Sequence, residues 1–195
     1  RVLHPPTLPD LTWLDALVQG RMALCPVCGW RGHAFTGKLD AHVCPSCNST
    51  EDERSIWRHL AQTTLTYRRL PAVAIGIGSA LLKPWKEQFQ GSIWTPDGFA
   101  AEIKAKGRLA NRPSAMALCL VTRLSELTDE SRVQILQEFH RLLDKSAGKL
   151  VVVDDARFLE TPVFGEMGFT LHETSAFSSR ACRFGWRTIA TFGTK

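Results

Sequence analysis

The sequence has no apolar run long enough to cross a membrane. Its longest nearly uncharged apolar stretch, Leu70–Leu82, has 13 residues, whereas a membrane-spanning helix needs about 20. The first residues, Arg1–Trp13, contain prolines where a secretory signal peptide would need an apolar core. We therefore expect a cytoplasmic protein without a membrane partner.

Long blocks of like charge are also missing. Lys and Arg total 24 and Asp and Glu total 19 of the 195 residues, which gives a formal net charge of +5. The basic residues are spread along the chain, which favours a solvated basic surface and leaves contact with nucleic acid open. Hydrophobic residues make up 44% and charged residues 22%, a balance typical of a globular chain rather than a disordered one.

The sequence has six cysteines, and their spacing is informative. Four of the six cysteines form two Cys-x2-Cys pairs with 15 residues between them: Cys25, Cys28, Cys44 and Cys47. This spacing is typical of a zinc site with four thiolate ligands. Gly29 follows one pair and Asn48 the other, and these residue types best tolerate the positive φ at which such a knuckle turns back. Disulfides would need an oxidising compartment, of which the sequence gives no sign.

Four thiolates close the coordination shell, which favours a structural zinc ion over a catalytic one. His33 and His42 lie between the pairs and are the less favoured alternative ligands. We expect the metal to fold residues 22–50, a piece too small to build its own core. Its strands would be Trp30–Phe35 and Leu39–Val43, as a ribbon hairpin. Such a ribbon either braces the neighbouring domain or contacts nucleic acid or protein.

The rest of the sequence divides into three parts. Residues 1–21 contain a short helical segment. Residues 51–69 hold a connecting helix whose acidic first turn suits the helix dipole, and Ser49 or Thr50 can cap it. Residues 70–195 form the main domain.

Strand-like and helix-like segments alternate in the main domain. Short, wholly apolar or β-branched segments predict buried strands, and apolar residues at three- or four-residue spacing predict helices. The expected strands are Ala72–Ile77, Ser92–Thr95, Met116–Val121, Leu150–Val153, Phe169–Phe177 and Arg183–Phe192. The expected helices are Leu81–Phe89, Ser131–Leu143 and Glu160–Met167. This alternation, closed by an antiparallel strand pair at the sheet edge, predicts a three-layer α/β domain.

Motifs in both parts of the chain resemble a known family. CPVCGW…CPSCNS, followed by a helix and a strand–glycine–helix unit, resembles bacterial S-adenosylmethionine-dependent (class I) methyltransferase-like proteins with an N-terminal zinc ribbon. QEFHRLLDKSAGKLVVV is similar to the helix, turn and fifth strand of their core, and MALCLVTRLSELTDES to the fourth strand and its loop. GFTLHETSAFSSRACRFGWRTIATF resembles the closing strand pair. The resemblance implies a Rossmann-like sheet with helices on both faces, over most of residues 22–195.

The resemblance also implies a cofactor loop. In the family, the first strand ends in an acidic residue followed by a Gly-x-Gly-x-Gly turn, where the backbone approaches S-adenosylmethionine. Here GIGSA keeps the first two glycines, and Ala74 stands at the acidic position. The expected cofactor-binding residues are Gly76, Gly78, Ser79 and Asp97. Asp97 lies two positions beyond the usual place of the carboxylate that holds the ribose hydroxyls.

Residues that carry the chemistry are not identified by the sequence. Only 20 residues separate Thr95 from Met116, little room for the helix, strand and helix usual in the family. Asp154 and Asp155 follow a central strand, and we expect solvated loop residues there rather than an acid–base pair. Cys119, Cys182 and His140 are expected to pack in the core.

Three functions follow as hypotheses. The first is a methyltransferase that uses S-adenosylmethionine on an unidentified acceptor. The second is a non-enzymatic binding or assembly subunit with the same fold, and the third is a zinc-ribbon protein that binds nucleic acid. The corresponding partners are a small-molecule acceptor, another protein, or nucleic acid.

Overall fold

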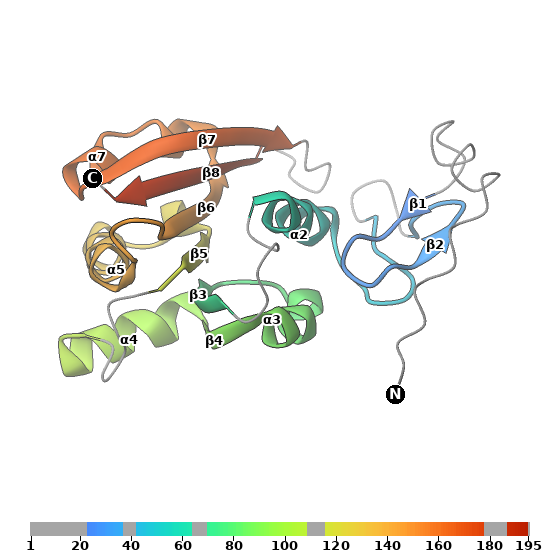
Figure 1. Ribbon diagram of the computed structural model, residues 1–195, viewed down its shortest axis with the longest axis horizontal. Coiled ribbons are helices and arrows are strands. Elements are labelled where there is room, and N and C mark those ends of the chain that lie inside the picture. Colours follow the sequence, from blue (N-terminus) through green and yellow to red (C-terminus); the bar gives the residue numbers. More distant parts are fainter. Residues whose placement is uncertain (1–22, 37–41, 64–69, 109–115, 178–186, 195) are drawn as a thin grey trace.

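The computed structural model describes residues 23–36, 42–63, 70–108, 116–177 and 187–194 (Figure 1). The expected N-terminal helical segment and Cys182 lie outside these ranges, as does the turn of the expected ribbon hairpin. No helix within the described ranges is both long and apolar enough to span a bilayer.

A six-stranded, mostly parallel sheet forms the centre of the chain (Figure 1). Its strands are β3 (Leu70–Ile75), β4 (Phe89–Trp94), β5 (Leu118–Thr122), β6 (Lys149–Asp155), β7 (Phe169–Phe177) and β8 (Arg187–Thr194). In the order β4-β3-β5-β6-β8-β7, the first four strands are parallel, and β8 runs antiparallel to both neighbours. The expected α/β fold with a closing antiparallel pair is confirmed.

Helices cover both faces of the sheet. They are α2 (Glu51–Thr63), α3 (Leu82–Gln88), α4 (Pro96–Lys106), α5 (Asp129–Leu142), α6 (Ala156–Leu159) and α7 (Val163–Glu166), with 3-10 turns η1 (Ser79–Leu81) and η2 (Leu124–Glu126). α4 and α5 pack on one face, and α2 and α3 on the other (Figure 1). Alternate β3 residues serve the two cores: Val73 and Ile75 face α4 and α5, and Ala72 and Ala74 face α2 and α3. Because β3 is covered on both sides, it needs an unbroken apolar sequence.

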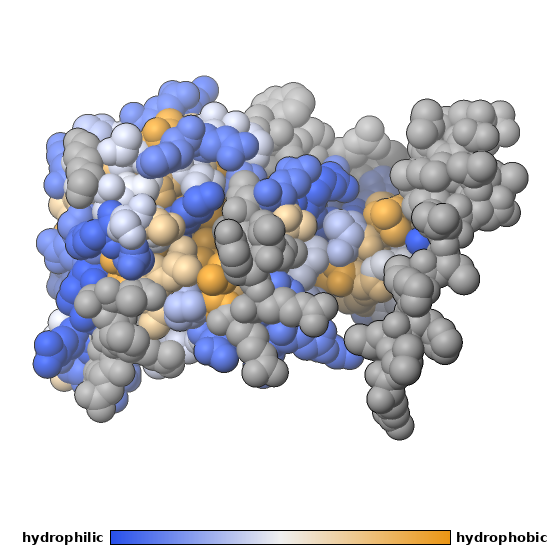
Figure 2. All heavy atoms as spheres, viewed as in Figure 1, coloured by the Kyte–Doolittle hydropathy of each residue, from blue (hydrophilic) through white to orange (hydrophobic). Residues whose placement is uncertain are grey.

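Hydrophilic residues cover the outer part of the α/β domain in Figure 2, and hydrophobic residues show mainly in the middle of that view. The exposed large apolar side chains of the described residues are Leu24, Leu82 and Leu171. They belong to β1, α3 and β7, which lie in different parts of the molecule (Figure 1), so they are scattered single residues rather than a docking patch.

The structure differs from the expected elements in four places, one of which is α4, a helix that the sequence patterns did not predict. The expected ribbon hairpin is reduced, in the described residues, to a bridge between Thr36 and Val43. Instead, β1 (Ala23–Leu24) pairs with β2 (Arg31–Gly32) around the first cysteine pair. β4 starts at Phe89 rather than Ser92, because Gly91, which has no Cβ, fits against the backbone of its partner on β3.

The helix expected at Glu160–Met167 is present but shorter. α7 (Val163–Glu166) lies within this range, and a separate short helix, α6, ends before it at Leu159, with Pro162 between the two. Proline has no N–H to donate and disfavours helical backbone in the residue before it, so one continuous helix cannot run through this position.

Candidate functional site

The sheet has a topological switch point between β3 and β5. The chain leaves β3 for β4 on one side and then crosses back to β5 on the other. Open α/β sheets bind ligands in the crevice outside the carboxyl ends of such strands. A cavity of about 280 Å³ lies there, lined by the ends of β3, β5 and β6 and by the start of α2. We call it the carboxyl-edge cavity.

Gly76 makes the turn that leaves β3. Its φ of +74° lies in the left-handed region that favours glycine. A Cβ atom at this position would lie 2.7 Å from the hydroxyl oxygen of Thr122, and that hydroxyl donates a hydrogen bond to the Gly76 carbonyl (2.7 Å). The Gly76 N–H donates to the carbonyl of Trp94, at the end of β4 (3.0 Å). Both neighbouring strands therefore hold this turn.

Gly78 faces a carboxylate that comes from α2. A Cβ atom at Gly78 would overlap the Glu53 side chain. Glu53 Oε1 accepts a hydrogen bond from the Ala80 N–H (3.1 Å) across 27 positions of sequence. Glu53 is only 7% exposed. The glycine loop after β3 therefore packs against a buried acidic side chain from another element.

A capping box at the start of α2 holds Glu53. The Thr50 N–H donates to Glu53 Oε2 (2.8 Å), and the Thr50 hydroxyl accepts from the Glu53 N–H (3.3 Å). Of the two caps expected from the sequence, Ser49 and Thr50, the structure selects Thr50. Sequence reasoning missed Glu53 at the site, although the Thr-x-x-Glu pattern identifies it as a capping residue.

The structure brings three of the four expected cofactor-binding residues to the cavity. Those that line it are Gly76, Gly78 and Ser79. Asp97 is exposed in the first turn of α4 and is not among the lining residues. Thr122 and Arg123, at the end of β5, also line the cavity and were missed, because the order of the strands is needed to place them beside β3.

Asp154 is not a solvated loop residue, contrary to expectation. It is 4% exposed at the end of β6. Its carboxylate accepts hydrogen bonds from the Ser125 N–H (2.8 Å), the Ser125 hydroxyl and the Asp155 N–H (2.8 Å). Asp155 caps α6 by accepting from the Arg157 N–H (2.8 Å). Both carboxylates hold loops in place, and Asp154 is buried because it satisfies the loop after the neighbouring strand.

The four cysteines of the Cys-x2-Cys pairs form one cluster. Their Sγ atoms all lie within 4.8 Å of one another, with Cys25 and Cys47 3.7 Å apart and Cys28 and Cys44 3.6 Å apart. Four sulfurs bound about 2.3 Å from one tetrahedral zinc ion are roughly 3.8 Å apart. The donor atoms and their spacing therefore fit zinc.

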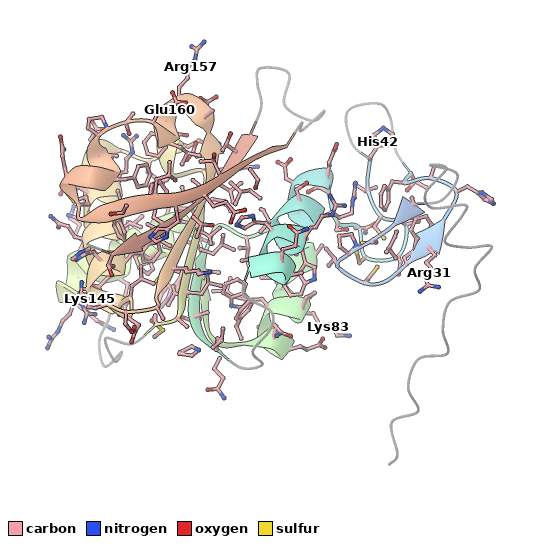
Figure 3. The ribbon with its side chains drawn as sticks, turned by 45° about the horizontal axis from the view of Figure 1, so that its top comes forward. Arg31, His42, Lys83, Lys145, Arg157 and Glu160 are labelled. Atoms are coloured by element: carbon pink, nitrogen blue, oxygen red, sulfur yellow. The ribbon has the colours of Figure 1, made fainter. Side chains whose placement is uncertain are left out.

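Each Cys-x2-Cys pair forms a tight turn, here called a cysteine knuckle, and the two knuckles have the same hydrogen-bond pattern. The Gly29 N–H donates to the Cys25 carbonyl (2.9 Å) and the Asn48 N–H to the Cys44 carbonyl (2.8 Å). Gly29 and Asn48 have φ values of +75° and +56°, as the sequence predicts. Figure 3 shows the side chain of His42 directed away from the sulfur atoms, which argues against this histidine as a ligand.

The surroundings of the cysteine cluster stabilise negative charge at Cys25, whereas burial raises the pKa of the Cys28 and Cys44 thiols. Burial raises the pKa of the Cys25 thiol, but hydrogen bonds from the Ser49 hydroxyl and nearby backbone N–H groups outweigh it and lower the pKa to about 7. Arg54, which is 5% exposed, donates to the carbonyls of Ser49 and His42. Burial lowers the pKa of Arg54, and the nearby thiolates oppose that shift. A buried cation therefore lies beside a cluster that stays anionic when zinc is bound.

No protein-family model matches the sequence, and no curated protein matches it. Solved structures do match the fold. An S-adenosylmethionine-dependent methyltransferase from Leishmania major aligns with a TM-score of 0.53 at 11% identity, over 72% of this chain and 71% of that chain. A Pyrococcus horikoshii protein aligns with a TM-score of 0.50 at 14% identity, over 77% of this chain and 94% of that chain.

A third similar structure contains ligands. It is the 1,6-didemethyltoxoflavin-N1-methyltransferase of Burkholderia thailandensis, with bound 1,6-didemethyltoxoflavin and S-adenosylhomocysteine. It aligns with a TM-score of 0.51 at 11% identity, over 74% of this chain and 77% of that chain. At such low identity the likeness concerns the fold. The α/β part of this chain has the fold of S-adenosylmethionine-dependent methyltransferases, and a four-cysteine cluster precedes it.

Proposed function

We propose that this chain binds S-adenosylmethionine in the carboxyl-edge cavity and transfers its methyl group to a small-molecule acceptor. The observation that carries the proposal is the position of this cavity. It lies at the switch point of a methyltransferase-type sheet, against the glycine turn that leaves β3. The S-adenosylhomocysteine in the Burkholderia structure supports the same class of ligand.

The residues around the cavity suit a positively charged nucleoside. Gly76 and Gly78 bring bare backbone to the wall, and two carboxylates, from Asp52 and Glu53, line it. We assign the ribose end to Asp97, which is exposed just outside the cavity lining, because its neighbour Pro96 lies beside Gly76 at the edge of the turn. When bound, the cofactor supplies a methyl group on a positively charged sulfur. The chain then has to hold and align the two reactants, work that requires no covalent help from a side chain.

We also propose that the four cysteines hold a structural zinc ion. The knuckle of the second cysteine pair leads directly into Ser49 and Thr50, which contact the cluster and cap α2 respectively. A zinc ion there would fix the start of α2 and therefore the wall of the carboxyl-edge cavity. Four thiolates leave no open position for a substrate, so this zinc would have no part in the reaction.

Two glycine variants test the proposal. Gly76 and Gly107 both have φ near +70°, but a Cβ at Gly76 would lie 2.7 Å from Thr122 Oγ1, whereas nothing lies within 4 Å of one at Gly107. We expect the Gly76→Ala change to push the loop off Thr122 and weaken S-adenosylmethionine binding at least tenfold. The Gly107→Ala change adds only local backbone strain, about 1 kcal/mol, and leaves binding unchanged.

Calorimetric titration of S-adenosylmethionine into the zinc-loaded chain provides the measurement. Binding by the unmodified chain that is lost in the Gly76→Ala variant and kept in the Gly107→Ala variant supports the proposal. No heat at millimolar ligand would contradict it and favour a non-enzymatic subunit with this fold.

A further inference from the structure

Glu53 is a buried carboxylate in the wall of the carboxyl-edge cavity. It is 7% exposed and lines the cavity. Its oxygens accept hydrogen bonds from the N–H and hydroxyl of Thr50 and from the N–H of Ala80. These donors are neutral groups, and the ion pairs found in the described ranges do not include Glu53. Buried carboxylates are ordinarily paired with a cation.

Two basic residues near Glu53 have other partners. Arg54 donates to the carbonyls of Ser49 and His42, on the side of the cysteine cluster. Arg123, at the cavity, has a side chain that is 58% exposed and lies 3.8 Å from Glu126. The N-terminus of α2 stabilises the Glu53 carboxylate with only a partial positive charge. The cavity wall therefore presents a negative charge that the described side chains leave uncompensated.

We propose that Glu53 supplies the counter-charge for the cationic end of the ligand, its sulfonium or its α-ammonium group. Ala74, at the end of β3, carries no charge, and Glu53 brings a carboxylate to the same loop from α2. Glu53 Oε1 has one hydrogen bond, from Ala80, and a carboxylate oxygen can accept a second. The inference rests on the proposed function and makes Glu53 a specificity-determining residue of that site.

Three adenosyl compounds that differ in their cationic groups separate the roles of the sulfonium and the ammonium. S-adenosylmethionine carries both cations, S-adenosylhomocysteine keeps only the ammonium, and 5′-methylthioadenosine has neither. For the zinc-loaded full chain we expect calorimetry to show at least tenfold weaker binding of 5′-methylthioadenosine than of S-adenosylmethionine. The affinity of S-adenosylhomocysteine tells which cation Glu53 faces. This affinity stays close to that of S-adenosylmethionine if Glu53 faces the ammonium, and falls toward that of 5′-methylthioadenosine if Glu53 faces the sulfonium.

A charge-neutralising variant tests the residue itself. The Glu53→Gln change is expected to weaken S-adenosylmethionine binding at least tenfold and to leave 5′-methylthioadenosine binding unchanged. The Glu51→Gln change is the matched control, because Glu51 lies in the same first turn but does not line the cavity. It should leave both affinities within twofold. Circular dichroism and thermal melting show whether each variant folds.

The outcomes separate the two proposals. Equal binding of S-adenosylmethionine by the unmodified chain and a folded Glu53→Gln variant overturns the role of Glu53 and leaves the proposed function standing. If the unmodified chain binds none of the three compounds, the proposed function fails and this inference fails with it. Should Glu53→Gln not fold, equal affinities of the unmodified chain for S-adenosylmethionine and 5′-methylthioadenosine overturn the inference.

Discussion

Glu53 and Arg54 are consecutive residues of α2 that serve two different sites. Successive side chains on a helix point about 100° apart, so neighbours in sequence can face different parts of the structure. Glu53 contacts the glycine loop, whereas Arg54 contacts the carbonyls of Ser49 and His42 and lies 3.8 Å from the ring centroid of Phe35. At the scale of single residues, Arg54 therefore attaches the cysteine knuckles to the helix.

Replacing Arg54 tests this attachment. The Arg54→Met change keeps a long apolar stem but leaves two carbonyls without their donors, and hydrogen bonds from charged groups are worth about 1.5–3 kcal/mol each. Water can hydrate the part-buried His42 carbonyl after the change, so we expect a loss below the sum of two such bonds, about 2–4 kcal/mol in the free energy of unfolding, measured with urea in the presence of zinc. The exposed Arg58 of the same helix provides the control. If Arg58→Met is as destabilising as Arg54→Met, the attachment is not specific.

At the scale of elements, α2 is held to the sheet by a buried histidine. His59 is 5% exposed. Its Nε2 lies 3.0 Å from the Thr191 hydroxyl on β8, and its Nδ1 lies 3.3 Å from the Ser175 hydroxyl on β7. Burial is the main cause that lowers the pKa of His59. The charge of Glu173 raises this pKa, and the charge of Lys149 lowers it. The folded chain therefore keeps this ring neutral at pH values where the unfolded chain protonates it.

This difference predicts how stability depends on pH. The unfolded chain takes up a proton near pH 6.5, and the folded chain does so only at lower pH. The free energy of unfolding should thus be highest above pH 6.5 and fall as the pH drops through the folded pKa of His59. We expect the His59→Gln variant to show a smaller fall between pH 7.5 and 6, measured by urea unfolding with zinc retention checked.

His140 needs a parallel control. Burial and the neighbouring Lys145 also lower the pKa of His140. The His140→Gln variant should therefore also reduce the fall of the free energy of unfolding with decreasing pH, independently of His59. An unchanged pH dependence in the His59→Gln variant would show that the ring of His59 is not kept neutral by burial.

At the scale of the whole molecule, one chain of contacts runs from the cysteine cluster to the carboxyl-edge cavity. α2 lies between the cysteine knuckles and the sheet (Figure 1). The Ser49 hydroxyl lies 3.3 Å from Cys25 Sγ and 3.2 Å from Cys47 Sγ, and the next residue, Thr50, caps α2 and binds Glu53. The cysteine cluster and the cavity therefore share one wall. By contrast, β5 and β6 are buried between the two helix layers.

Removing the proposed zinc ion should loosen that wall and spare the sheet. In hydrogen-exchange measurements after chelation, we expect faster exchange at the first turn of α2, with β5 still protected, because β5 does not depend on the knuckles. The Cys28→Ser change should have the same effect and lower the zinc content. Cys119→Ala is the control, since Cys119 is fully buried on β5, outside the cluster. Uniform exchange across the chain would mean that the two parts unfold as one unit.

Much of the fold was predictable because it depends on local patterns. The Cys-x2-Cys spacing predicts the cysteine cluster, and the Gly and Asn that follow predict the positive φ of both knuckles. Unbroken apolar segments predict the buried strands β3, β5 and β6, since a strand covered on both faces has no polar side. The helix starting at Glu51 is predicted by its cap and acidic first turn. Each of these signals lies within a few residues of the structure it predicts.

The site was less predictable, because it forms from segments far apart in the sequence. Glu53 meets Ala80 across 27 positions, and Asp154 meets Ser125 across 29. Neither pairing has a local pattern. Asp97 is exposed at the start of α4, outside the cavity lining, so its assignment to the ribose end stays a prediction.

By itself, the amino-acid sequence determined which segments become strands, helices and cysteine knuckles, because hydrophobic period, capping and ligand spacing act over short distances. Only the tertiary structure decided that β5 lies beside β3 and that α2 carries Glu53 to the glycine loop. Those pairings depend on how whole layers pack, and packing fixes contacts between segments that share no sequence signal.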